Sequence, residues 1–220
     1  MFFLELLLLP ILIFILLSVI LLPFKFAFFS LLNLIYVPVQ LFKIATNKQL
    51  RVNHALEHAT INVLEKEFGY VGLTGYAKES GFFIQGRVQP IHLEKAALMG
   101  LKKLRNGETH LVVHKRCGTS ILAANFMAAA IFIVLLWQTG MISFFNIILA
   151  VLIAQLSGPM LGRILQESIT TSTDVRNIDI VGLDYQADKA FSFLGVAFKT
   201  PPAEFFVKTK RASEVEVIKL

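Results

Sequence analysis

Long apolar runs alternate with polar segments along the chain. Residues 1–22 and 26–44 are both apolar runs, and the polar break between them holds Pro23 and Lys25. Each run has close to the ~20 residues that cross a bilayer as an α-helix, and the break predicts a tight turn. The first run lacks the basic start and cleavage site of a signal peptide. The pattern therefore predicts a retained N-terminal pair of transmembrane helices over residues 1–44.

A second apolar region covers residues 119–162, which include no charged residue. Its length fits two membrane-spanning helices rather than one. The turn residues at 138–140 separate them, and Gly158 with Pro159 predicts the end of the second helix. The expected fold class is thus an α-helical integral membrane protein with about four transmembrane helices in two pairs.

Two polar segments follow these helix pairs, and both show soluble patterns. Residues 45–118 predict a small α+β insert: a helix at 51–68 capped by Asn53, glycine-rich strands within 69–90, an amphipathic helix at 91–107, and a strand at 108–114. Residues 163–220 form a soluble tail, predicted to be short and β-rich because 177–185 and 205–220 alternate polar with apolar residues.

Composition agrees with this division. The chain is 55% hydrophobic, and its 16% of charged residues compares with about 25% in a soluble domain, so the lipid bilayer is its first expected partner. The net charge is +6, and the basic residues collect in the insert and the tail. The positive-inside rule therefore places both segments and the N-terminus in the cytoplasm. Because no dense basic run occurs, nucleic-acid binding is not expected.

The polar helix after the first apolar region carries the pattern H-x-x-E-H. His54 and His58 are four residues apart, so a helix places both imidazoles on one face, where they can share a metal ion. Glu57 lies between them in projection and can take a proton from a metal-bound water, as in zinc-protease helices. Glu65 lies two turns further along that face, either as a further ligand or as a residue that orients one. The alternative is a surface helix that happens to carry two histidines.

A second candidate group lies just before residue 119, where the chain enters the membrane again. His114 and Cys117 are three residues apart, a spacing that can bring two ligands to one ion. The alternatives are an ordinary strand histidine and a packed cysteine next to the capping residue Thr119. The insert leaves and re-enters the same membrane surface, so chain order brings the two groups near each other. Imidazole and thiolate ligands favour zinc over magnesium or calcium.

Taken together, the motifs and their order resemble the YqhQ-like family of bacterial membrane proteins, which are described as metal-dependent enzymes. The resemblance covers residues 51–182. It departs from the family pattern at Ala59, where the family has lysine, and at Lys115, where it has proline. The resemblance implies a metal site but no substrate. The matching residues are His54, Glu57, His58, Ile61, Glu65, His114, Arg116, Cys117, Gly118, Thr119 and Ser120, and more loosely Thr170, Thr171 and Asp174.

The resemblance further implies ligand roles for His54, His58, His114 and Cys117, and supporting roles for Glu65, Arg116, Thr119 and Asp174. Two classes of function follow. The first is a membrane-bound zinc-dependent hydrolase or peptidase that acts on a peptide or small molecule, with Glu57 as general base. The second is a membrane scaffold or assembly factor, with a closed four-ligand metal site of structural purpose. A third reading makes Cys117 a nucleophile with His114 as its base.

Overall fold

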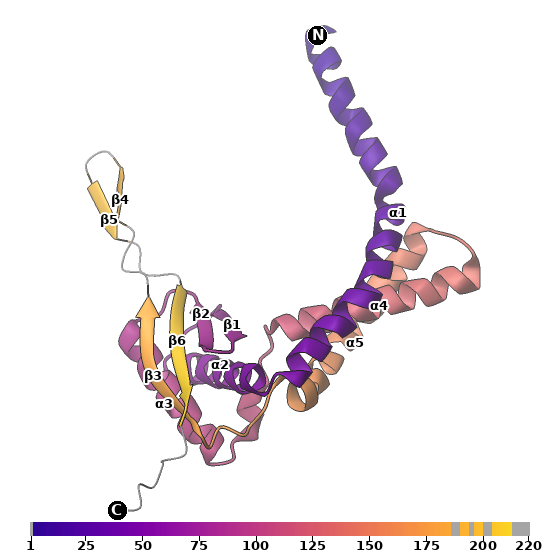
Figure 1. Cartoon of the computed structure of the whole chain (residues 1–220). Helices are drawn as coiled ribbons and strands as arrows, with labels where there is room; N and C mark the ends of the chain where they lie inside the picture. Colours follow the sequence, from indigo (N-terminus) through magenta and orange to yellow (C-terminus); the bar gives the residue numbers. More distant parts are fainter. Residues whose placement is uncertain (1, 186–189, 194–195, 200–203, 213–220) are drawn as a thin grey trace, which may run out of the picture. The chain divides into compact units, whose positions relative to one another are not determined.

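The computed structural model describes residues 2–185, 190–193, 196–199 and 204–212, with side chains over 8–184 and 204–212. The chain divides into two compact units. One unit comprises Met1–Val39 and Ile121–Leu161, and the other comprises Gln40–Ser120 and Gly162–Leu220. Figure 1 shows the helices and the sheet from which these units are built.

The first helix, α1 (Phe2–Thr46), runs without interruption through Pro23. The turn predicted at Pro23 and Lys25 was wrong. A proline removes only one backbone N–H donor. In a bilayer no water is present to satisfy the other backbone groups, so the chain stays helical and keeps their hydrogen bonds. The 45 residues rise about 67 Å, more than twice the ~30 Å hydrocarbon core of a bilayer.

The count of four transmembrane helices is not confirmed. Within the described residues, three helices are long and apolar enough to cross a membrane. They are Leu8–Thr46, Gly118–Thr139 and Phe144–Thr170. The described part of the chain therefore has three candidate membrane spans and a small antiparallel sheet.

Helices α4 (Gly118–Thr139) and α5 (Phe144–Leu165) form the second apolar region. The break predicted between them is confirmed, but α5 does not end at Gly158 and Pro159. It runs through Pro159, and Gly158 serves helix packing instead. A Cβ on Gly158 would lie 2.6 Å from the Cβ of Ala124 in α4, so only glycine allows this close approach.

The second unit begins with α2 (Lys48–Glu67), which confirms the helix predicted over the histidine motif. Its N-cap is Asn47, which accepts a hydrogen bond from the amide of Leu50, and not Asn53 as predicted. Asn53 is fully buried and donates to the carbonyls of Lys78 and Glu79. It therefore links the helix to the turn between β1 and β2. The sequence pattern cannot distinguish an asparagine in this role from one that caps a helix.

The remaining elements of the insert follow the predicted order with one exception. The predicted strand at 108–114 was wrong, because the segment forms a 3-10 turn and its apolar residues Leu111 and Val112 are both buried. The predicted glycine-rich strands and the amphipathic helix are confirmed. The elements are β1 (Thr74–Lys78), β2 (Gly81–Gln85), α3 (Pro90–Arg105) and η1 (Thr109–Val112).

Strands from the insert and the tail combine into one antiparallel sheet of order β1-β2-β6-β3. Its tail strands are β3 (Ile178–Tyr185) and β6 (Glu204–Arg211), and a separate ribbon holds β4 (Ala190–Phe193) and β5 (Val196–Lys199). Residues 213–220, the end of the strand predicted from 205, lie outside the described residues.

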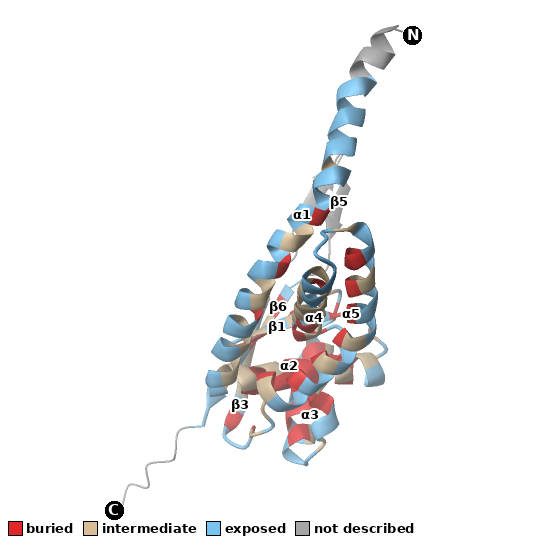
Figure 2. Cartoon of the chain, turned by 90° about the vertical axis from the view of Figure 1, so that its right-hand side faces the viewer, coloured by how far each residue is buried: buried red, intermediate tan, exposed pale blue. Residues whose placement is uncertain are grey.

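One core joins the sheet to α2 and α3. It buries Phe82 and Ile84 from β2 with Phe205 and Val207 from β6, and in Figure 2 the middle of α2 is coloured almost wholly as buried. A helix buried on most of its surface is held rigidly by packing. The two histidines of α2 are therefore carried on a fixed support.

Candidate metal centre

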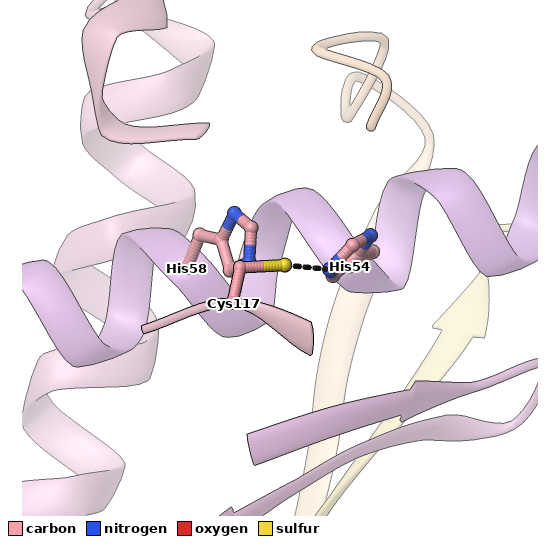
Figure 3. Close-up of side chains that lie close together, drawn as sticks. All are labelled: His54, His58 and Cys117. Carbon is pink, nitrogen blue, oxygen red and sulfur yellow. Dashed lines mark hydrogen bonds between the residues drawn. The ribbon is translucent and has the colours of Figure 1, made fainter. Parts of the chain in front are cut away.

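Three potential ligand atoms converge on one side of α2. The rings of His54 and His58 lie 4.4 Å apart between centroids, as their four-residue spacing requires. Cys117, directly before α4, brings its thiol to the same place, and one donor atom from each of the three residues lies within 4.8 Å of the others. Figure 3 shows the thiol between the two imidazoles. The group His54, His58 and Cys117 is called the His2Cys cluster below.

Backbone carbonyls fix the orientation of both imidazoles. Nδ1 of His54 lies 2.9 Å from the carbonyl oxygen of Thr170, and Nδ1 of His58 lies 2.5 Å from that of Val112. A carbonyl only accepts hydrogen bonds, so each Nδ1 carries a proton, and Nε2 is the ring nitrogen left to face a metal. This is the arrangement by which proteins orient a histidine toward a metal.

Three buried polar atoms lack a partner among the described side chains: Glu57 Oε2, His58 Nε2 and Thr170 Oγ1. Two of them belong to the H-x-x-E-H motif, and the third belongs to the residue whose carbonyl orients His54. Buried polar groups are nearly always paired, and unpaired ones call for an explanation. A ligand held by the His2Cys cluster would supply a partner for His58 Nε2.

Glu57 lies buried beside the cluster, against the backbone of β1. A Cβ on Gly75 would lie 2.7 Å from Glu57 Oε1 and 2.5 Å from the carbonyl oxygen of Phe83, so the carboxylate fits only because residue 75 is glycine. Burial raises the pKa of Glu57 to about 8; His54 opposes this shift and Cys117 adds to it. A carboxyl group that exchanges its proton near neutral pH suits a general base.

Burial shifts the protonation of two cluster residues, His58 toward and Cys117 away from the form that binds a metal. Burial lowers the pKa of His58 well below its usual value, so the imidazole is neutral and able to bind a metal. Burial raises the pKa of the Cys117 thiol, an effect that hydrogen bonds from Thr119 partly offset. The amide of Thr119 lies 3.3 Å from Cys117 Sγ, so this predicted supporting residue contacts the thiol directly.

His114 does not join the three converging donors. Its Nε2 lies 3.5 Å from Glu65 Oε2, and burial lowers its pKa while Glu65 opposes that shift. Glu65 therefore contacts His114 rather than the cluster. The thiol of Cys117 contacts His54 at 3.3 Å, so the alternative nucleophilic pair of Cys117 with His114 is not formed.

The two remaining predicted supporting residues, Asp174 and Arg116, have side-chain contacts outside the cluster. Asp174 forms ion pairs with Lys48 at 2.8 Å and with Arg176 at 3.2 Å, contacts that lower its pKa. Arg116 is exposed and lies against Gly72, where an added Cβ would be 3.7 Å from its guanidinium. Within the described residues, neither side chain forms an ion pair or hydrogen bond with His54, His58 or Cys117.

Several residues that shape the site carried no readable signal in the sequence. The carbonyls of Val112 and Thr170 act through the backbone, which every residue shares. Gly75 is one of 13 glycines, and its role depends on the position of Glu57. The side chain of Gln166 accepts a hydrogen bond from the amide of His114 at 2.8 Å, and only the fold brings these two residues together.

Fold and site define a protein with candidate membrane spans and a separate α+β unit that holds a His2Cys cluster beside a buried glutamate. The chain belongs to the family described as a domain of unknown function, DUF6391, whose pattern matches residues 49–183. This range contains every residue of the site. The match is to that family, and nothing in the comparisons points specifically to a YqhQ-like protein.

One curated relative is an uncharacterized protein, SYNPCC7002_A1392 of Picosynechococcus sp. (strain ATCC 27264 / PCC 7002 / PR-6). It is 30% identical over 135 residues, which cover 56% of this chain and 66% of the relative. The match therefore spans just under two thirds of that protein. No solved structure matches the chain.

Proposed function

We propose that the His2Cys cluster binds zinc and that the chain is a membrane-bound, zinc-dependent hydrolase. The observation that carries the proposal is the number of converging donors. Three protein ligands on a tetrahedral ion leave one position for water or substrate, the pattern of catalytic rather than structural zinc sites. Four protein ligands would have closed the site, and His114 lies instead against Glu65.

The donors present fit zinc. Two imidazole nitrogens and one thiolate are ligands that zinc accepts readily, whereas magnesium and calcium prefer oxygen. The carbonyls that accept hydrogen bonds from both Nδ1 atoms supply the outer contacts of the site, that is, the hydrogen bonds that orient the metal ligands without touching the metal. The resemblance to the YqhQ-like family, which stays a prediction, supports the same assignment. Bound zinc would supply Lewis acidity and would acidify a water molecule.

The role proposed for Glu57 is that of general base. Its carboxyl group lies buried beside His54 and Cys117, has one oxygen without a partner, and exchanges its proton near pH 8. It would take a proton from the attacking water and return it to the leaving group, as one residue can do in both directions. Its narrow fit against Gly75 would hold the carboxylate in place during both transfers.

Chain connectivity supports action at the membrane surface. Cys117 directly precedes α4, whose 22 residues rise about 33 Å and so nearly match a bilayer core of ~30 Å. If α4 spans the membrane, Cys117 lies at the depth of the lipid headgroups. The proposed substrates are therefore peptides or small molecules with an amide or ester bond that is reachable at this depth.

Metal analysis of detergent-purified protein tests the proposal. We expect about one zinc per chain, together with hydrolysis of at least one member of a panel of fluorogenic peptides and esters presented in mixed micelles. Chelation should abolish the hydrolysis, and added zinc should restore it. Absence of bound metal would refute the proposal. One zinc per chain without hydrolysis would favour the alternative function, a scaffold with a structural metal.

The pH dependence of zinc binding provides a second test. At pH 7 the Cys117 thiol and the Glu57 carboxyl group hold protons because burial raises both pKa values, while His58 is already neutral. Zinc must displace the thiol proton, and its charge should also expel that of Glu57, so about two protons leave and affinity rises with pH. Calorimetry in buffers of different ionisation enthalpy measures this release. Glu57→Gln should reduce it to about one, and equal release by both proteins would contradict the assignment.

A further inference from the structure

The described chain continues past α5 into η2 (Gln166–Thr170), a single π-helical turn. Such turns are rare and frequently occur at functional sites. This turn belongs to the same compact unit as α2 and the segment around Cys117. It contacts both, although none of the three proposed metal ligands lies within it.

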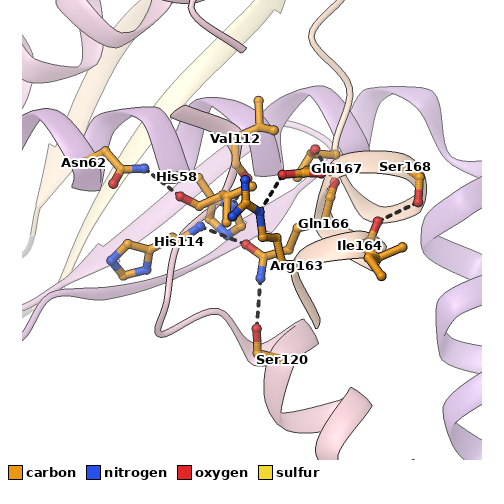
Figure 4. A network of polar contacts seen from close by, with 12 residues as sticks. His58, Asn62, Val112, His114, Ser120, Arg163, Ile164, Gln166, Glu167 and Ser168 are labelled. Carbon is orange, nitrogen blue, oxygen red and sulfur yellow. Dashed lines mark hydrogen bonds and ion pairs between the residues drawn. The ribbon is translucent and has the colours of Figure 1, made fainter. Parts of the chain in front are cut away.

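The side chain of Gln166 holds both ends of the segment that carries Cys117. It is 1% exposed. Its Oε1 accepts a hydrogen bond from the amide of His114 at 2.8 Å, and its Nε2 donates to Ser120 Oγ at 2.9 Å. Figure 4 shows the amide bridging these two residues. They lie three residues before and three residues after Cys117, so one side chain fixes the path of the backbone that presents the thiol.

The position of Ser120 depends in turn on Gly162. A Cβ on Gly162 would lie 2.6 Å from Ser120 Oγ. The glycine therefore leaves the space in which the hydroxyl meets Gln166. The hydrogen bond between Gln166 and Ser120 thus depends on a buried glutamine and on the space that Gly162 leaves for the hydroxyl group.

The other end of η2 orients His54, the second proposed metal ligand. The carbonyl of Thr170 accepts the Nδ1 proton of His54 at 2.9 Å. The guanidinium of Arg51, one turn earlier on α2, donates to the carbonyls of Ser168 and Thr171. The shape of the turn is thus anchored on α2 itself, and it orients the imidazole of His54.

We propose that Gln166 is a positioning residue for the metal site and that η2 couples Cys117 to His54. The inference rests on the proposed metal site and adds an element that assembles it. Because coupling between two equilibria is reciprocal, a metal ion held by both ligands should stabilise η2, and an intact η2 should strengthen metal binding. Gln166 contacts His114 and Ser120 rather than any of the three donors, so its role is not catalytic.

The first experiment replaces Gln166 by methionine, which keeps the volume and removes both hydrogen bonds. Cobalt(II) serves as the probe because thiolate ligation gives it a charge-transfer absorption. We expect this absorption per bound cobalt to fall and the affinity to drop ~10–100-fold, the usual effect of losing an outer contact. The matched control is Gln89→Met, because Gln89 is exposed and makes no side-chain capping bond. It should behave like the wild type.

A milder variant and a second readout cover the case in which Gln166→Met fails to fold. Ser120→Ala removes one of the two hydrogen bonds and should give a smaller change of the same sign. In the wild type, zinc should slow amide hydrogen exchange over residues 166–171, and in Gln166→Met or Ser120→Ala this protection should shrink. A wild type that binds no cobalt would refute the proposed metal site. If the wild type shows the thiolate signal, and Ser120→Ala and folded Gln166→Met show the same signal and affinity, the positioning role is refuted while the metal site stands.

Discussion

A His58→Ala variant is expected to lose its zinc, with affinity reduced by more than about 100-fold, since outer contacts alone cost ~10–100-fold. His58 is fully buried, and its Nε2 has no partner in the described protein. Alanine removes one of three ligands and leaves two, too few for a stable zinc site. Elemental analysis after dialysis against a weak chelator measures the loss.

Two further variants separate ligand loss from misfolding. Alanine at position 58 also deprives the Val112 carbonyl of its donor, which costs about 1–3 kcal/mol of stability. His54→Ala removes a ligand from a half-buried position and should lose zinc with less destabilisation. His110→Ala is the control, because His110 is exposed, and it should keep the metal. Full zinc content in folded His58→Ala protein would show that His58 is not a ligand.

The elements with strong periodicity could be predicted from the sequence, and those that depend on neighbours could not. The helix at 51–68 and the strands near Tyr76 and Phe83 carry their own local patterns. By contrast, α1 continues through Pro23 although the local signal predicts a turn. The preference of proline for a turn competes there with the need to keep backbone hydrogen bonds across a long apolar run, and the second effect prevails.

The candidate site shows the same limit at finer scale. The spacing of His54 and His58 on one helix face is a local property, so their juxtaposition could be predicted. Whether His114 or Cys117 would join them could not, because each lies in an irregular segment whose path is set by contacts such as that of Gln166. The sequence also offers no sign of which ring nitrogen faces the cluster, since backbone carbonyls decide this.

The catalytic role proposed for Glu57 makes the second prediction with a large effect. Glu57→Gln should keep one zinc per chain, because the carboxyl group is not among the three converging donors. Hydrolysis of whichever panel substrate the wild type cleaves should fall by ~10²–10⁴-fold, the contribution typical of a general base. Glutamine matches the shape of the side chain against Gly75 but cannot accept a proton. Turnover measured beside zinc content distinguishes loss of the base from loss of the metal.

Glu67→Gln provides the matched control, since Glu67 lies on the same helix, pairs with Lys103 at the surface, and is remote from the cluster. A readout that needs no substrate is the cobalt absorption spectrum as a function of pH. In the wild type this spectrum should titrate well below pH 8, because a bound metal holds the pKa of Glu57 below its value of about 8 in the metal-free chain. This titration should be absent from Glu57→Gln. If Glu57→Gln kept both full turnover and the wild-type spectral titration, Glu57 would be a packed residue of α2. The His2Cys cluster would then act without a protein base.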